Sequence, residues 1–142
     1  MKIFYGKILG VDLGLKKTGL AISDEMWTTI QLLPNLIPKS RIEDINHLLK
    51  LCLLLDIKTI LIGYPILPKS FEEGVMAKRV RGFYETFLLH ADRALRVFLI
   101  DEIYTSLEAR KRLKLKKLHL NLIDSESAKI LIETFIDHHT NL

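Results

Sequence analysis

Four acidic residues could do chemistry together if the fold brings them close: Asp12, Asp101, Glu102 and Asp124. Asp12 interrupts an apolar stretch, Lys-Ile-Leu-Gly-Val-Asp-Leu, where a charge is costly unless it is paired or binds a metal ion. Gly10 and Gly14, which flank it, leave the backbone open to close approach by a ligand. Oxygen ligands from distant parts of a chain suit a hard divalent cation such as Mg²⁺ or Mn²⁺.

Clustered carboxylates of this kind are typical of metal-assisted hydrolysis. They repel one another and raise one another's pKa, and a bound cation relieves that repulsion. Two ions about 3.5–4 Å apart can activate a water molecule and stabilise the leaving oxygen of a phosphodiester. Each position also has a simpler interpretation. Asp12 could open a turn, Asp101 and Glu102 could be solvated loop residues, and Asp124 could be an N-cap.

The surrounding pattern predicts the elements that would position these acids. Strands are expected over 7–13, 18–23 and 27–33, the last ended by Pro34, with buried strands over 59–62 and 97–100. Amphipathic helices are expected after Ser40 as N-cap, over 76–88, from a capping box at 105–108, and over about 125–138. Asp124 shares the helical face of Ala128 and Phe135, so its carboxylate is expected to point toward the sheet.

This order predicts one α/β domain over residues 1–142. Three antiparallel strands as a meander and two parallel strands would form a mixed five-stranded sheet with helices on both faces. Ligands of such sheets usually lie beyond the carboxyl ends of the parallel strands. Asp12 and the pair Asp101–Glu102 stand at those ends, which favours the metal hypothesis.

Basic residues form a second candidate site, for a nucleic-acid partner. Six of the eight positions from 110 to 117 are basic: Arg110, Lys111, Arg112, Lys114, Lys116 and Lys117. Lys16, Lys17, Arg79 and Arg81 could extend the same phosphate-binding surface. A solvated helix face is the alternative interpretation. Aromatic residues do not interleave with these charges, so contact with the backbone of a folded or duplex substrate is favoured over base stacking.

Composition bounds the class of protein. The 142 residues are 49% hydrophobic with a net charge of +4, which suits one filled core rather than disorder. Cys52 is the single cysteine, so an intrachain disulfide is excluded, and its leucine-rich surroundings predict burial. No stretch reaches the roughly 20 apolar residues of a membrane span, and the N-terminus is not a signal peptide, so a cytoplasmic protein is expected. No pattern specifies an oligomeric state.

The segment Gly10–Asp24 closely resembles the opening motif of the YqgF/RuvX family. The resemblance continues through 63–65, 101–102, 105–110 and 123–133, and so covers nearly the whole chain. It implies an RNase H-like fold and a nuclease that matures the 5′ end of pre-16S rRNA. The alternative is a Holliday junction resolvase acting on branched DNA. The family resemblance also implies that Asp12, the acidic pair Asp101–Glu102 and Asp124 bind Mg²⁺ or Mn²⁺, with two ions expected.

The acidic pair needs one further distinction. Successive strand residues point to opposite faces, so at most one of Asp101 and Glu102 is expected to face the site directly. The family pattern shows both acids, so the resemblance alone does not choose between them. Glu102 is favoured as the metal ligand, because related RNase H-like nucleases often carry Glu on this strand and its longer side chain can reach an ion held mainly by Asp12. Asp101, which stays a catalytic candidate, would then orient the backbone or help to hold the following turn. Two departures affect substrate contacts: Ile103 stands where the family usually has Arg, and residues 66–71 replace a polar loop.

Two other classes of function compete with a nuclease. Asp12-Leu-Gly14 before a hairpin also resembles the first phosphate motif of actin-like and sugar-kinase-like ATPases, but 142 residues leave no room for their duplicated half. A non-catalytic RNA-binding module on the same fold is the second alternative. Its weakness is that a pure phosphate binder gains nothing from clustered negative charge.

Overall fold

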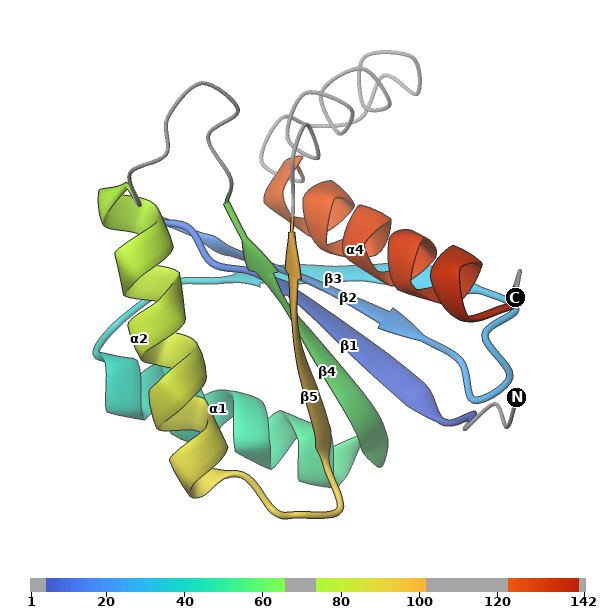
Figure 1. Ribbon diagram of the computed structural model, residues 1–142. Coiled ribbons are helices and arrows are strands. Elements are labelled where there is room, and N and C mark those ends of the chain that lie inside the picture. The colour runs from blue at the N-terminus through green and yellow to red at the C-terminus, as the bar shows by residue number, and fades with distance from the viewer. Residues whose placement is uncertain (1–4, 66–73, 102–122, 141–142) are drawn as a thin grey trace.

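The computed structural model describes residues 5–65, 74–101 and 123–140, with only the backbone of Ile123 and Asp124. Five strands form one sheet in the order β3-β2-β1-β4-β5 (Figure 1). The antiparallel meander consists of β1 (Lys7–Asp12), β2 (Thr18–Ser23) and β3 (Ile30–Leu36). The remaining strands, β4 (Ile57–Tyr64) and β5 (Arg96–Asp101), run parallel to β1. The predicted mixed sheet is confirmed, and the carboxyl ends of β1, β4 and β5 lie at one edge.

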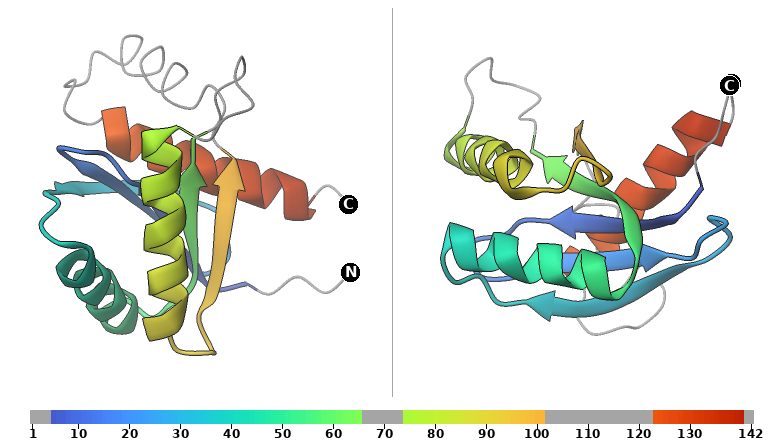
Figure 2. Two further views of the ribbon diagram at one scale, coloured as in Figure 1. Left: turned by 60° about the vertical axis from the view of Figure 1, so that its left-hand side comes forward. Right: turned by 90° about the horizontal axis from the view of Figure 1, so that it is seen from below.

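Helices cover both faces of this sheet, as predicted. One face is covered by α1 (Arg41–Leu54) and α2 (Val75–His90), and the other by α4 (Ile123–Thr140), as the two views of Figure 2 show. Each side has its own apolar core. Leu9, Val11 and Ile62 belong to the core under α1 and α2, whereas Ile8 and Leu61 belong to the core under α4. None of the helices in the described ranges is long and apolar enough to cross a membrane.

Gly10 brings α4 unusually close to the sheet. Side chains of β1 alternate between the two cores, and Gly10 falls on the α4 side. A Cβ atom at Gly10 would overlap the carbonyl oxygen of Ala128 and lie 3.0 Å from Cγ1 of Ile132. The missing side chain therefore lets the helix backbone rest on the strand backbone. Asp12, two residues further along β1, lies on the same α4 side.

The third strand begins later than predicted, because Asp24 closes a turn before it. The Asp24 carboxylate accepts the backbone N–H groups of Thr28 at 2.7 Å and Thr29 at 2.8 Å, and the Thr28 hydroxyl at 2.6 Å. These hydrogen bonds, chiefly the one from the Thr28 side chain, lower the pKa of Asp24 to about 2. Within this turn Trp27 has a φ of 61°, in the left-handed region, so β3 starts only at Ile30.

Pro34 does not end this strand, contrary to the prediction; it lies inside β3. The register between β2 and β3 shifts between Thr18 and Leu20, so Pro34 and Asn35 lie opposite Gly19 alone. This is a β-bulge on an edge strand, which is where a residue without a backbone N–H is tolerated.

Several smaller expectations have mixed outcomes. Ser40 is the N-cap of α1, as predicted, and its hydroxyl accepts the backbone N–H of Glu43 at 3.1 Å. Cys52 is buried, as predicted, and burial raises the pKa of its thiol to about 12. The strand predicted to be fully buried, β5, is instead a half-buried edge strand, because only β4 pairs with it in the described chain. The last helix begins at Ile123, before the predicted start, so Asp124 lies in its first turn.

The close approach at Gly10 generates a stability prediction. We expect Gly10→Ala to lower the free energy of unfolding by about 1–3 kcal/mol, because the added methyl group meets helix backbone that cannot move aside freely. The matched control is Gly82→Ala in α2. A Cβ atom there would meet only the flexible guanidinium end of Arg41, at 2.6 Å, and alanine gains up to about 1 kcal/mol in helix propensity. Urea unfolding measures both variants, and equal destabilisation would contradict this account of α4 packing.

Candidate active site

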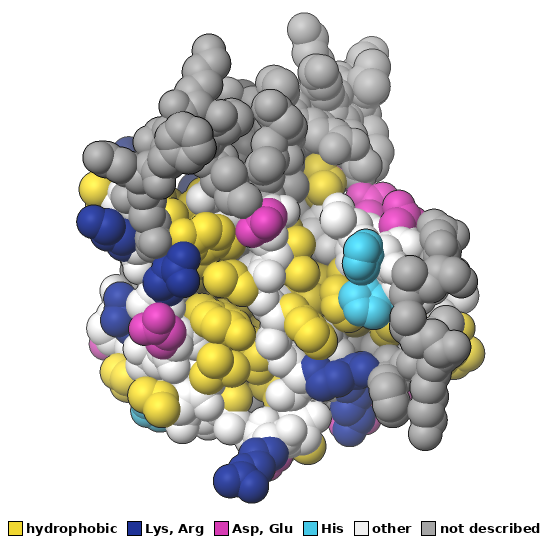
Figure 3. Space-filling view, in the orientation of Figure 1, with side chains coloured by type: hydrophobic (Ala, Val, Ile, Leu, Met, Phe, Trp, Pro, Cys, Tyr) yellow, Lys and Arg dark blue, Asp and Glu magenta, His cyan; other side chains and the backbone are white. Residues whose placement is uncertain are grey.

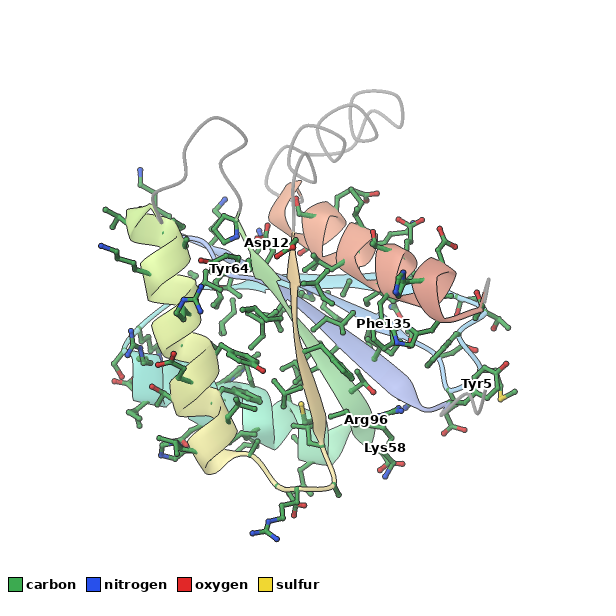
Figure 4. The ribbon with its side chains drawn as sticks, viewed as in Figure 1. Tyr5, Asp12, Lys58, Tyr64, Arg96 and Phe135 are labelled. Carbon is green, nitrogen blue, oxygen red and sulfur yellow. The ribbon has the colours of Figure 1, made fainter. Side chains whose placement is uncertain are left out.

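Asp12 ends β1 at the carboxyl edge of the sheet and is only 8% exposed. Figure 4 shows it at the same end of the molecule as Tyr64, the last residue of β4, whereas Arg96 and Lys58 lie at the opposite end. On its other side Asp12 pairs with Gly19 of β2. The predicted central acid is therefore a nearly buried carboxylate on the central strand. It lies at the carboxyl ends of the parallel strands, where α/β proteins bind ligands.

The first turn of α4 lies over this carboxyl end of β1. Three contacts fix the direction of the helix. Ser125 meets Leu20, whose pairing partner is Val11, and Ala128 lies on Gly10. Phe135 packs against Trp27 near the start of β1, with ring centroids 5.9 Å apart. The helix therefore runs antiparallel to β1. Four residues of a helix extend about 6 Å along its axis, which nearly equals the about 6.6 Å that two residues of a strand span.

This direction places the backbone of Asp124, one turn before Ala128, at the level of Asp12. The fold therefore brings together two chain positions that are 112 residues apart in the numbering, 124 minus 12. The face of α4 predicted to cover the sheet is buried, since Ala128, Leu131 and Ile132 are each at most 1% exposed.

The alternation of side chains along β5 shows on which face of the sheet Asp101 lies. Phe98 contacts Phe135 of α4, with ring centroids 5.4 Å apart, and Ile100 packs into the core under α4. Val97 and Leu99 pack into the core under α1 and α2. By this alternation Asp101, which is exposed, belongs to the α2 side and not to the side of Asp12. Glu102 lies outside the described residues.

An arginine is held at the same edge by an aromatic residue. The guanidinium of Arg81 donates a hydrogen bond to the Tyr64 hydroxyl at 2.9 Å, and its Cζ atom lies 5.2 Å from the centre of the Tyr64 ring. Tyr64 is level with Asp101 in the sheet. Arg81 was predicted as a phosphate contact, whereas Tyr64 was not predicted to have a role. The sequence signal for a role of Tyr64 is its position: it is a polar aromatic residue immediately after Gly63, the glycine that follows the apolar run 59–62.

Basic side chains lie on two sides of the carboxyl end of the sheet. Lys16 and Lys17 are exposed in the turn that follows Asp12. In Figure 3, Lys and Arg side chains gather over the N-terminal part of α2. This helix carries Arg79, which is half-buried, and Arg81, which is exposed. The run of basic residues at 110–117 lies outside the described residues, as do Ile103 and the segment 66–71.

Within the described ranges, no three Asp, Glu, His or Cys side chains converge as metal ligands. Two of the three predicted ligands are not covered by that statement, because the side chains of Glu102 and Asp124 are not described. Glu126 is fully buried as well. However, helix residues two positions apart point in nearly opposite directions, so Glu126 does not share the side of α4 on which Ala128 lies against Gly10.

Comparison with known proteins identifies relatives along almost the whole chain. The family model described as "RuvX: Holliday junction resolvase" matches residues 6–138. A protein of Sulfurihydrogenibium sp. is 35% identical over 134 residues, which cover 92% of this chain and 90% of the relative. One from Syntrophus aciditrophicus is 30% identical over 135 residues, covering 92% and 88%. Both carry the name "Putative pre-16S rRNA nuclease".

Solved structures show the same fold at low sequence identity. Thermus thermophilus RuvC in complex with a Holliday junction substrate superposes with a TM-score of 0.63 at 11% identity, covering 96% of this chain and 98% of that one. The fowlpox virus resolvase, in complex with Holliday junction DNA, gives a TM-score of 0.57 at 14% identity, covering 94% and 99%. The RNase H-like fold predicted from the sequence is thereby confirmed.

Proposed function

The chain belongs to the RuvX family, and from that premise we propose that it is a divalent-metal-dependent endonuclease that matures the 5′ end of pre-16S rRNA. The observation that carries the proposal is the placement of Asp12. It is a nearly buried carboxylate at the carboxyl edge of the sheet, and the helix turn that contains Asp124 lies above it. The names of the sequence relatives supply the substrate. This role implies a cytoplasmic protein, with which a single buried thiol is compatible.

The donor atoms of this site fit Mg²⁺ or Mn²⁺. Asp12, Glu102 and Asp124 offer only carboxylate oxygens, which are the ligands that these hard cations prefer. We propose that these three residues hold two ions. Bound there, the ions would activate the attacking water and stabilise the leaving oxygen of the phosphodiester. Burial of Asp12 keeps its carboxylate fixed and limits competition from bulk water.

The alternation along β5 supports Glu102 over Asp101 as the ligand from that strand. Phe98 and Ile100 face α4, on the side of Asp12, and the next residue of the same parity is Glu102. Asp101 has the parity of Leu99 and lies on the α2 side, near the Tyr64–Arg81 pair. We propose that Asp101 acts from there on the basic groups that hold the substrate.

We propose that the basic residues around the carboxyl end of the sheet bind the substrate. Lys16 and Lys17 extend from the turn after Asp12, and Arg79 and Arg81 lie on α2. Together with the basic run 110–117, they would hold the phosphate backbone while the carboxylates act on one phosphodiester. Holliday junction resolution is the second candidate function, because the description of the family model names it. Mn²⁺-dependent cleavage of a pre-rRNA 5′ fragment, compared with a four-way DNA junction, distinguishes the two.

Asp12→Asn should lower the rate of pre-rRNA cleavage by about 100-fold or more, because even residues that only support a metal ligand often cost 10–100-fold. Binding of the RNA and the thermal midpoint should stay close to wild type, since the substitution preserves shape. The matched control is Asp56→Asn, an exposed aspartate whose φ of 55° asparagine accepts readily. Full activity in Asp12→Asn would overturn the metal site.

The pair on β5 is separated by Asp101→Asn and Glu102→Gln. We expect Glu102→Gln to abolish Mn²⁺-dependent cleavage and Asp101→Asn to retain most of it, with both proteins equally stable to heat. The physical reason is that successive residues of a strand point to opposite faces of a sheet, and Asp101 belongs to the α2 side. Loss confined to Asp101→Asn would reverse the assignment.

Neutralising Lys111, Lys114 and Lys117 together should weaken binding to unrelated RNA sequences alike. For each phosphate that the protein no longer neutralises, the slope of log K against log salt should fall by roughly 0.7–0.9. Lys58→Gln is the control, because Lys58 pairs with Asp56 at 2.9 Å, at the end of the sheet opposite Asp12 (Figure 4). If the triple variant keeps the wild-type slope, the basic run only makes the surface soluble.

A further inference from the structure

Ser125, the residue after Asp124, has a hydroxyl that joins α4 to two strands. It is fully buried. Its Oγ atom donates toward the carbonyl oxygen of Leu33 at 2.9 Å and toward Oδ1 of Asn35 at 2.6 Å, and it accepts the backbone N–H of Leu20 at 3.4 Å. The hydroxyl has a single proton, so the two acceptors share it, and the oxygen is enclosed by polar partners from β2 and β3.

These partners are grouped by the β-bulge of β3. The register shift sets Pro34 and Asn35 opposite Gly19 alone, which locally interrupts the pairing of β2 with β3. The Ser125 hydroxyl bridges Leu20 of one strand and Leu33 of the other beside this shift. Asn35, within the bulge, turns its amide to the same oxygen. The β-bulge of β3 therefore brings together the hydrogen-bond partners of one side chain of α4, that of Ser125.

The first turn of a helix is its least restrained part, because its backbone N–H groups have no partners within the helix. We propose that Ser125 is a positioning residue that fixes this turn of α4, and with it Asp124, over the carboxyl end of β1. The inference rests on the proposed function, since Asp124 contributes only if the carboxylates hold an ion. Hydrogen bonds of 2.9 and 2.6 Å to β3, with the longer one of 3.4 Å from β2, would limit the turn to one position relative to Asp12.

Binding of Mn²⁺ to the full chain, measured by titration calorimetry, tests this role without relying on cleavage. Ser125→Ala should raise the Kd for Mn²⁺ about 10-fold, the lower end of what loss of a supporting group costs a metal site. Ser127→Ala is the matched control. Ser127 is 1% exposed, and its hydroxyl has no hydrogen-bond partner in the described part of the chain, so its loss should leave the Kd unchanged.

Asn35→Ala removes the side-chain partner of Ser125 on β3 and so tests the same hydrogen bond from the other side. Asn35 is half-buried, so it tolerates truncation better than the fully buried Ser125. It should also weaken Mn²⁺ binding, and its effect in combination with Ser125→Ala should be less than the product of the two single effects, because both act on one hydrogen-bond network. In metal-free protein, hydrogen exchange should be faster in both variants at the N–H groups of residues 127–130, which bond back to the carbonyl groups of the first turn of α4.

The outcomes separate this inference from the proposed function. A wild-type Kd in Ser125→Ala, with binding abolished in Asp12→Asn, would overturn the positioning role and leave the metal site intact. Equal weakening in Ser125→Ala and Ser127→Ala would also overturn it, because general loosening of the helix would then suffice. Wild-type protein that binds no Mn²⁺ would overturn both proposals.

Discussion

The contact of α4 with β1 at Gly10 is the constraint on which the rest of the site depends. Because Gly10 has no side chain, the helix backbone rests directly on the strand backbone, and the helix cannot shift along the strand without losing that fit. This contact fixes which helical turn lies at the level of Asp12. It also holds the helix low enough for a side chain as short as that of Ser125 to reach the backbone of β2 and β3.

The pleat of the sheet divides the carboxyl edge into two chemical sides. On the α4 side lie Asp12 and the turn that contains Asp124; on the α2 side lie Tyr64, Arg81 and Asp101. The sheet therefore separates carboxylates that would bind cations from a guanidinium that would bind phosphate. A substrate at this edge would meet both sides at once.

Much of this arrangement could be predicted from the sequence, because it depends on local patterns. Alternation and apolar runs predicted all five strands, and the right-handed crossover rule predicted that β4 and β5 run parallel to β1. The errors arose where single side chains compete with a pattern. The Asp24 carboxylate closes a turn that delays β3, and Pro34 stays within a strand because an edge with a bulge needs no N–H there. The role of Ser125 could not be predicted, since its partners lie about 90 residues away and meet it only through a register shift.

Pro34 has a consequence beyond the molecule itself. A sheet edge with regularly spaced N–H and C=O groups can accept a strand from another chain, and repeated addition of that kind produces aggregates. On β3 the bulge interrupts the spacing and Pro34 removes one donor, so an incoming strand would lose its register after a few residues. The same irregularity that receives the Ser125 hydroxyl thus makes the β3 edge a poor template for a strand from another copy of the chain.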